Sequence, residues 1–148
     1  NDLQCTILLD NLPFFMYTNN IIKKERKIMT INIKKTFTAV EDGIANMIAA
    51  ANADYENFNV SDEMKARFKE EWVIKNGSKY TKIMTNNGGT AWGFVVNVDN
   101  DKKFKKGTLL KCAGWSAPER NGSRGNVLEG GFPINWTGPL YLVGKGSI

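Results

Sequence analysis

Apolar residues at intervals of three and four positions mark the first regular element of this chain. They predict a helix from about Ala39 to Tyr55, because residues three and four apart lie on the same face of a helix. Thr38 and Glu41 have the spacing of a capping box, in which a hydroxyl and a carboxylate satisfy free backbone N–H groups. The apolar stripe consists of Val40, Ile44, Met47, Ile48, Ala51, Tyr55 and Phe58. We expect this stripe to pack against the protein core.

A second, shorter helix is predicted after Ser61. The Ser61 hydroxyl is suited to cap it, and Asp62 and Glu63 place negative charge at the positive end of the helix dipole. Asn76-Gly77 is expected to end this helix, since Asn and Gly accept the backbone conformations found after helices. The side chains expected on its buried face are Met64, Phe68 and Trp72.

The rest of the chain alternates apolar and polar positions, which is the pattern of strands. Residues 86–89 tolerate positive φ and therefore predict a turn between two strands. In the second of these strands, alternation places Trp92, Phe94, Val96 and Val98 on one face and Ala91, Gly93, Val95 and Asn97 on the other. The predicted strands cover residues 79–85, 90–99, 108–115, 132–137 and 140–143.

Together these elements predict one α+β domain, in which N-terminal helices pack on a small, mostly antiparallel β-sheet. The expected domain spans residues 29–148. Residues 1–28 have neither a helical nor an alternating period, and we expect them to be a translated leader that precedes a native start at Met29. Lys24-Glu25 supports this expectation, because the dipeptide can be encoded by a ribosome-binding sequence at a suitable distance from Met29.

Charge is distributed unevenly along the chain, whose net charge is +5. Residues 29–72 contain five Lys and Arg against eight Asp and Glu, whereas residues 73–148 contain 11 against four. The basic region therefore favours an anionic partner. The absence of histidine excludes Ser–His and Cys–His nucleophilic catalysis. The two cysteines are too few for a disulfide framework, and no apolar run approaches the roughly 20 residues that cross a membrane.

Residues 111–126 combine small loop residues with two arginines, Arg120 and Arg124. Guanidinium groups bind phosphate oxygens, and nearby glycines allow backbone N–H groups to approach an anion. Three aromatic residues lie in the same basic region: Trp92, Phe94 and Trp115. Aromatic rings beside cations suit a nucleobase with its phosphates. The alternatives are a solvated surface loop and aromatic residues of the core. No catalytic constellation accompanies these residues, so binding is favoured over catalysis.

Four segments follow one another in the basic region and before it: Met29-Thr-Ile-Asn-Ile-Lys-Lys-Thr-Phe-Thr-Ala-Val-Glu-Asp-Gly-Ile, Gly77-Ser-Lys-Tyr80, Lys103-Phe-Lys-Lys-Gly-Thr-Leu-Leu-Lys111, and Trp115-Ser-Ala-Pro with Arg120 and Arg124-Gly-Asn. Together they resemble the first type of Thoeris anti-defence protein, a phage "sponge" family that sequesters signalling nucleotides. The resemblance extends over essentially Met29 to Tyr141.

The resemblance implies that the protein binds glyco-cyclic ADP-ribose, which the TIR-domain enzyme of a bacterial defence system produces, and holds it without degrading it. Some members of the family also hold cyclic trinucleotides. The family is described as an α+β fold whose dimers assemble into a hexamer, with ligand pockets at the dimer interface. It implies no cofactor, no metal, no membrane and no catalytic residue, and it places the protein in the cytoplasm of the infected bacterial host.

The resemblance also assigns ligand-binding residues. Arg120 and Arg124 would contact the anion and the base, Phe94 would lie against the adenine, and Asn97 would be a polar contact on the opposite strand face. Their expected neighbours are Trp92, Trp115 and Ser116. On this assignment, Arg124→Ala should abolish ligand binding and leave the fold intact.

A competing interpretation is a small basic nucleic-acid-binding or host-protein-inhibiting phage factor. Binding to a polynucleotide would weaken steeply with salt concentration, because counterions are released from the backbone. A closed small-molecule pocket should show a shallow dependence on salt. A purely structural oligomer, by contrast, would bind no small ligand.

Overall fold

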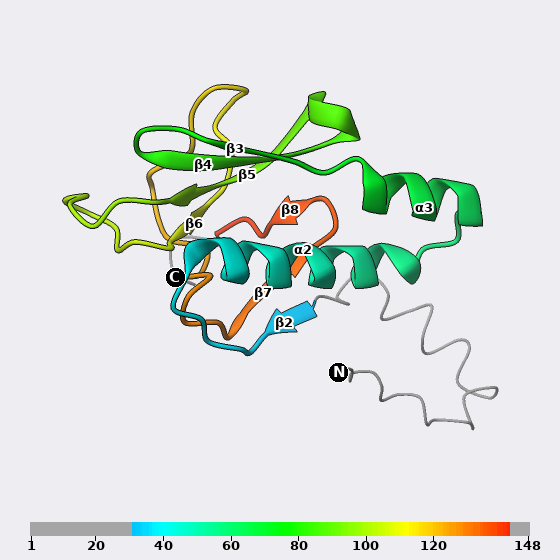
Figure 1. Ribbon diagram of the computed structural model, residues 1–148, viewed down its shortest axis with the longest axis horizontal. Helices are drawn as coiled ribbons and strands as arrows, with labels where there is room; N and C mark the ends of the chain where they lie inside the picture. Colours follow the sequence, from blue (N-terminus) through cyan, green and yellow to red (C-terminus); the bar gives the residue numbers. More distant parts are fainter. Residues whose placement is uncertain (1–30, 143–148) are drawn as a thin grey trace.

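The computed structural model describes residues 31–142 (Figure 1). The elements, in chain order, are β2 (Ile31–Ile33), α2 (Val40–Glu56), α3 (Asp62–Glu70), β3 (Val73–Asn76), β4 (Tyr80–Thr85), the 3-10 turn η3 (Asn86–Gly88), β5 (Thr90–Val96), β6 (Leu109–Leu110), β7 (Phe132–Asn135) and β8 (Gly138–Pro139). The predicted leader, residues 1–28, lies outside the described residues.

Within residues 31–142, two antiparallel sheets and two α-helices form the fold. One sheet has the strand order β3-β4-β5-β6 and the other β2-β7-β8. In Figure 1, α2 runs between the four-stranded sheet and strands β2 and β7. Its apolar stripe meets both sheets in one main core, because apolar surface is stabilised when it is removed from water. That core includes Ile44, Met47, Ile83, Val95, Leu109 and Ile134. The predicted α+β fold is confirmed.

The long helix α2 lies where it was predicted, but its predicted capping box is wrong. Ala39 is the N-cap residue, and no side chain caps the helix. Thr38 stands one position too early, so the spacing to Glu41 does not match the first turn. Gly43 brings the helix close to the main chain at Val127, since a Cβ at this position would collide with the Val127 carbonyl group.

Helix α3 begins as predicted, with the Ser61 hydroxyl accepting a hydrogen bond from the Met64 N–H at 3.2 Å. The prediction that Asn76-Gly77 ends this helix is wrong, because α3 ends at Glu70 and β3 follows. Pairing with β4 overrides the local helical pattern. The side chain of Met64 is exposed rather than buried.

The predicted hairpin of β4 and β5 is confirmed, and its turn has positive φ at Asn86, Asn87 and Gly88. One detail of the predicted alternation is wrong. Ile83 pairs with Gly93 and Met84 pairs with Ala91, so Trp92 is an extra residue in β5. This bulge turns Trp92 toward the main core, away from the face that carries Phe94 and Val96.

The remaining strands are shorter than predicted. The strand expected over residues 108–115 is reduced to β6, whose outer edge is covered by the following loop: the Leu109 N–H donates to the Gly125 carbonyl at 2.8 Å. Strand β7 lies within its predicted range, whereas residues 140–142 of the last predicted strand are not in a strand. Strand β2, which pairs with β7, was not predicted.

Candidate functional site

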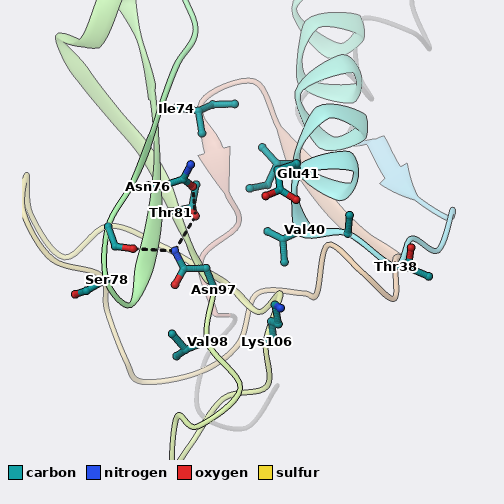
Figure 2. Close-up of a pocket in the computed structure, with 13 residues that line it drawn as sticks. Thr38, Val40, Glu41, Ile74, Asn76, Ser78, Thr81, Asn97, Val98 and Lys106 are labelled. Atoms are coloured by element: carbon teal, nitrogen blue, oxygen red, sulfur yellow. Dashed lines mark hydrogen bonds between the residues drawn. The ribbon is translucent and has the colours of Figure 1, made fainter.

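Two hollows lie on opposite faces of the four-stranded sheet, on either side of the turn between β3 and β4. The first, called the cavity, opens beside the start of α2 and has a volume of about 660 Å³ (Figure 2). The second, called the aromatic recess, has a volume of about 470 Å³. Gly77 and Ser78 line both. The other residues of the aromatic recess are Lys75, Lys79, Tyr80, Lys82, Phe94, Trp115 and Ser116.

The register of the strands decides which side chains reach each hollow. Lys75 lies opposite Lys82, and Lys82 lies opposite Phe94, so the three side chains stand on the face that forms the aromatic recess. Successive side chains of a strand point to opposite faces. Thr81 and its partner Asn76 therefore stand on the face toward the cavity.

The aromatic recess has a buried ring at its base and an exposed ring at its rim. Phe94 is 3% exposed, whereas Trp115 is 51% exposed. The Lys82 ammonium group lies 3.4 Å from the centre of the Trp115 ring and 5.9 Å from that of Phe94. Tyr80 stands edge-on to Phe94, with 6.0 Å between the ring centres. Because the Lys82 ammonium group covers one face of the Trp115 ring, a flat ligand would stack on the other face of the indole.

The positive charge of the aromatic recess is incompletely balanced. No acidic residue is among those that line it. Lys75 and Lys82 lie directly opposite each other, and neither forms an ion pair with another described residue. Like charges in directly opposed strand positions destabilise a sheet. A bound anion between the two ammonium groups would replace their repulsion by attraction.

Arg120 lies beside the aromatic recess and fixes one of its walls. It binds Asp101 through two nitrogens, at 2.9 and 3.0 Å, and donates to the Tyr80 hydroxyl at 2.6 Å. These bonds use three of the five N–H donors of a guanidinium group. Arg120 and Lys79 also line an adjoining depression of about 430 Å³. Arg120 thus positions Tyr80, and no described residue accepts a hydrogen bond from its two remaining donors.

Asp101 is the counter-ion of this cluster. Its carboxylate binds Arg120, accepts the backbone N–H groups of Lys103 and Phe104, and forms an ion pair with Lys79 at 3.3 Å. The hydrogen bond with Arg120, followed by those two backbone bonds, holds the pKa of Asp101 well below its usual range. Asp101 offsets one of the two positive charges of Arg120 and Lys79, and Lys75 and Lys82 add two charges that no described carboxylate pairs with.

Arg124 lies inside the protein and lines neither hollow. The residue is 8% exposed, and its guanidinium group donates to Glu119 at 2.9 Å, to Asn121 at 2.7 Å and to the Leu140 carbonyl at 3.4 Å. Its Nε atom is buried without a partner among the described residues. In this arrangement Arg124 joins the 119–125 loop to the backbone at Leu140.

The structure separates the seven residues that were predicted as a ligand site. Phe94, Trp115 and Ser116 come together in the aromatic recess, Arg120 lies beside it, Asn97 lines the cavity, and Trp92 and Arg124 are buried elsewhere. Trp92 donates its indole N–H to the Trp136 carbonyl at 2.9 Å and belongs to the main core. Trp92 is therefore a residue of the core, which is the alternative that the sequence left open for its aromatic residues.

The sequence reasoning missed two lysines that line the recess, Lys75 and Lys82. Their opposition depends on β3, which the sequence pattern assigned to a helix. Without the register of β3 against β4, the two lysines are seven positions apart in an unremarkable basic stretch. The basic balance of residues 73–148 was the one signal that pointed to them.

At the cavity, polar side chains from β3, from β4 and from the residue that follows β5 form a series of hydrogen bonds (Figure 2). The Asn97 amide nitrogen donates to the Thr81 hydroxyl at 3.0 Å and to the Gly77 carbonyl at 3.2 Å. Thr81 in turn donates to the Asn76 amide oxygen at 2.9 Å. These hydrogen bonds fix the orientation of the Asn76 and Asn97 side-chain amides.

Comparison of the chain with protein-family models, with curated proteins and with solved structures finds no match. Within residues 31–142, no helix has both the length and the apolar character that crossing a membrane requires. The same residues contain no group of three or more Cys, Asp or Glu side chains arranged to hold a metal ion.

Proposed function

We propose that the protein binds a phosphorylated nucleotide in the aromatic recess and sequesters it without cleaving it. The observation that carries this proposal is the directly opposed pair Lys75 and Lys82 beside Trp115 and Phe94, in a recess without an acid. The base would stack on Trp115, and the phosphates would lie between the two ammonium groups. A recess without a carboxylate or histidine lacks an evident general base, which favours holding the ligand intact.

The resemblance to the Thoeris anti-defence family gives this proposal a more specific form. The ligand would be glyco-cyclic ADP-ribose, with cyclic trinucleotides as a second class, and binding would block bacterial Thoeris immunity in the cytoplasm of the infected host. The active species would be a homodimer that assembles into a hexamer. A sponge must bind the signalling nucleotide more tightly than the receptor of that nucleotide does. Nanomolar affinity corresponds to a binding free energy of about −12 kcal/mol. One ion pair does not supply this, so stacking and several charged contacts must act together.

The decisive experiment is capture and release. The protein is incubated with the products of an activated TIR-domain enzyme, separated from free ligand and heat-denatured, and the released molecules are identified by mass spectrometry. We expect intact glyco-cyclic ADP-ribose. Release of cleaved product would show an enzyme, and release of nothing would overturn the proposal.

Matched variants locate the site in the same experiment. Lys75→Gln should weaken the affinity that underlies capture by about tenfold or more, because a charge-assisted contact contributes about 1.5–3 kcal/mol. Lys34→Gln removes an equal charge from an exposed position outside the recess, and should leave capture unchanged. Equal effects of the two substitutions would refute the recess as the binding site.

A second candidate function, binding of a single-stranded nucleic acid, is favoured by the exposure of Trp115 next to unpaired lysines. Exposed aromatic platforms in basic grooves bind successive bases. Titration of a fluorescent oligonucleotide at several salt concentrations separates the two functions. A steep loss of affinity with salt would support a polynucleotide ligand.

A further inference from the structure

Three Asn-Gly dipeptides occur in the sequence, at Asn76, Asn87 and Asn121, and all three asparagines are exposed. Asparagine is thermally labile, and most so before glycine, because the missing Cβ lets the next backbone nitrogen reach the side-chain amide carbon. Attack by that nitrogen closes a succinimide ring and expels ammonia, and water then opens the ring to aspartate or isoaspartate. The local structure of each dipeptide therefore decides which of them reacts.

The side-chain amide of Asn121 is in contact with a cation. Its oxygen accepts a hydrogen bond from Nη2 of Arg124 at 2.7 Å. The same guanidinium group donates to Glu119 at 2.9 Å and to the Leu140 carbonyl at 3.4 Å, so its position is fixed. When a nucleophile adds to an amide carbon, negative charge develops on the oxygen, and a preorganised donor stabilises that charge. Arg124 is always protonated and thus activates the Asn121 amide toward addition.

The nucleophile at this position is the backbone nitrogen of Gly122. No described residue accepts a hydrogen bond from the Gly122 N–H, so the loss of its proton breaks no bond of the described fold. Residues 121–123 lie in neither a helix nor a strand, and Asn121 and Ser123 are exposed, so water has access to the amide.

The dipeptide at Asn76 has the same sequence but a different environment. Asn76 and Asn121 are each followed by Gly-Ser. The Gly77 N–H donates to the Tyr80 carbonyl at 2.8 Å, so the nucleophile is held in the turn between β3 and β4. The Asn76 amide oxygen accepts from the neutral hydroxyl of Thr81 rather than from a cation. Asn76 is therefore a protected counterpart of Asn121 within the same molecule.

We propose that Asn121 is a site of spontaneous deamidation, activated by Arg124. The Gly122 nitrogen loses its proton and bonds to Cγ of Asn121, the Cγ–Nδ2 bond breaks, and the amide nitrogen leaves as ammonia with a proton. Water then adds to one of the two carbonyl groups of the ring and restores an open chain. The product has a carboxylate next to Arg124, and isoaspartate also lengthens the backbone of the 119–125 loop. This modification does not depend on the proposed binding of nucleotides.

The experiment compares the three asparagines in one sample. The protein is incubated at physiological temperature and mildly alkaline pH, folded or in urea, and peptide mapping by mass spectrometry follows the conversion at Asn76, Asn87 and Asn121. In the folded protein we expect Asn121 to convert about tenfold or more faster than Asn76, because a preorganised donor has a large effect on such additions. In urea the rates at Asn76 and Asn121 should be alike, since the two tripeptides are identical. Conversion of folded Asn121 at or below the rate of Asn76 would overturn the proposal.

Two substitutions test the role of Arg124. Arg124→Gln should slow the conversion of Asn121 about tenfold and leave Asn76 unchanged. Asn76 also reports unfolding of this variant, because Gly77 is held only while the hairpin of β3 and β4 is folded. Glu119→Gln is the matched control, since it alters the other partner of the guanidinium group but keeps the cation at Asn121.

We expect Glu119→Gln to convert Asn121 at least as fast as the wild type. Equal slowing in Glu119→Gln and Arg124→Gln would assign the effect to loop packing and refute the activation by Arg124. An unchanged rate at Asn121 in Arg124→Gln, with Asn76 also unchanged, would do the same.

Discussion

Asp54 is a single carboxylate buried where α2 meets the hairpin of β7 and β8. It is 2% exposed and accepts the backbone N–H of Trp136 at 2.8 Å. Burial raises the pKa of Asp54 above its usual value, and the bond from Trp136 opposes this in part. A raised pKa in the folded state means that the ionised carboxylate costs stability at neutral pH, and that protonation removes this cost as the pH falls.

Asp54→Asn is therefore expected to raise the melting temperature at neutral pH, because an amide oxygen still accepts from Trp136 and carries no charge. The difference between variant and wild type should shrink as the pH falls through the raised pKa of Asp54 toward 3.8. Thermal unfolding of both proteins across this pH range checks the prediction. A difference that grows toward acid pH would contradict the sign.

Arg124 is a charged residue in a buried position, so its substitution is expected to affect stability. Its buried guanidinium group satisfies Glu119, Asn121 and the Leu140 carbonyl, so Arg124→Ala should lower the free energy of unfolding by about 1–3 kcal/mol. The measurement is urea denaturation. This outcome differs from the sequence-based expectation of an intact fold that has lost only its ligand.

Arg67→Ala is the control for this prediction. Arg67 pairs with Glu71 on the exposed surface of α3, and such pairs contribute about 0.3–0.5 kcal/mol. An unfolding free energy that is unchanged in Arg124→Ala, together with loss of nucleotide capture, would restore a direct role in binding.

At the scale of elements, the long helix and the central hairpin were predictable, because each has a local cause. The apolar period gives α2, and the positive-φ residues Asn86 and Asn87 give the turn. Strand β3 and the bulge at Trp92 were not predictable in this way, since pairing with β4 decides both. For the same reason, the sequence predicted only part of the recess. Its aromatic residues stand out in the sequence, whereas the opposition of Lys75 and Lys82 depends on the register of β3 against β4.

Gly43 provides a test of how α2 sits on the rest of the protein. Helix propensity alone predicts that Gly43→Ala stabilises the protein by about 1 kcal/mol. The collision of the new Cβ with the Val127 carbonyl predicts the opposite, a loss of about 1–3 kcal/mol from overpacking. The sign of the change in urea denaturation decides between them, and a more stable variant would contradict the close packing of α2 at Val127.

In the whole molecule, the acidic and the basic regions of the sequence lie at different places in the structure. The acidic residues of the N-terminal region lie mainly on α2 and α3, whereas the lysines of β3 and β4 face the aromatic recess. The count of charges along the sequence indicated a basic region, but it did not show where the unpaired lysines of that region lie. The cavity on the opposite face has no counterpart in the charge pattern, because its residues come from four separated segments.

The pairing of β2 with β7 joins the two ends of the described chain, with Ile31 opposite Ile134. During synthesis at about 5–20 residues per second, the partner of β2 is added only about 5–20 s after β2 itself. Until then the β2 edge and the adjoining side of α2 lack their cover. A nascent chain therefore keeps an open core until β7 has been synthesised, and we expect it to become resistant to proteases only after that point.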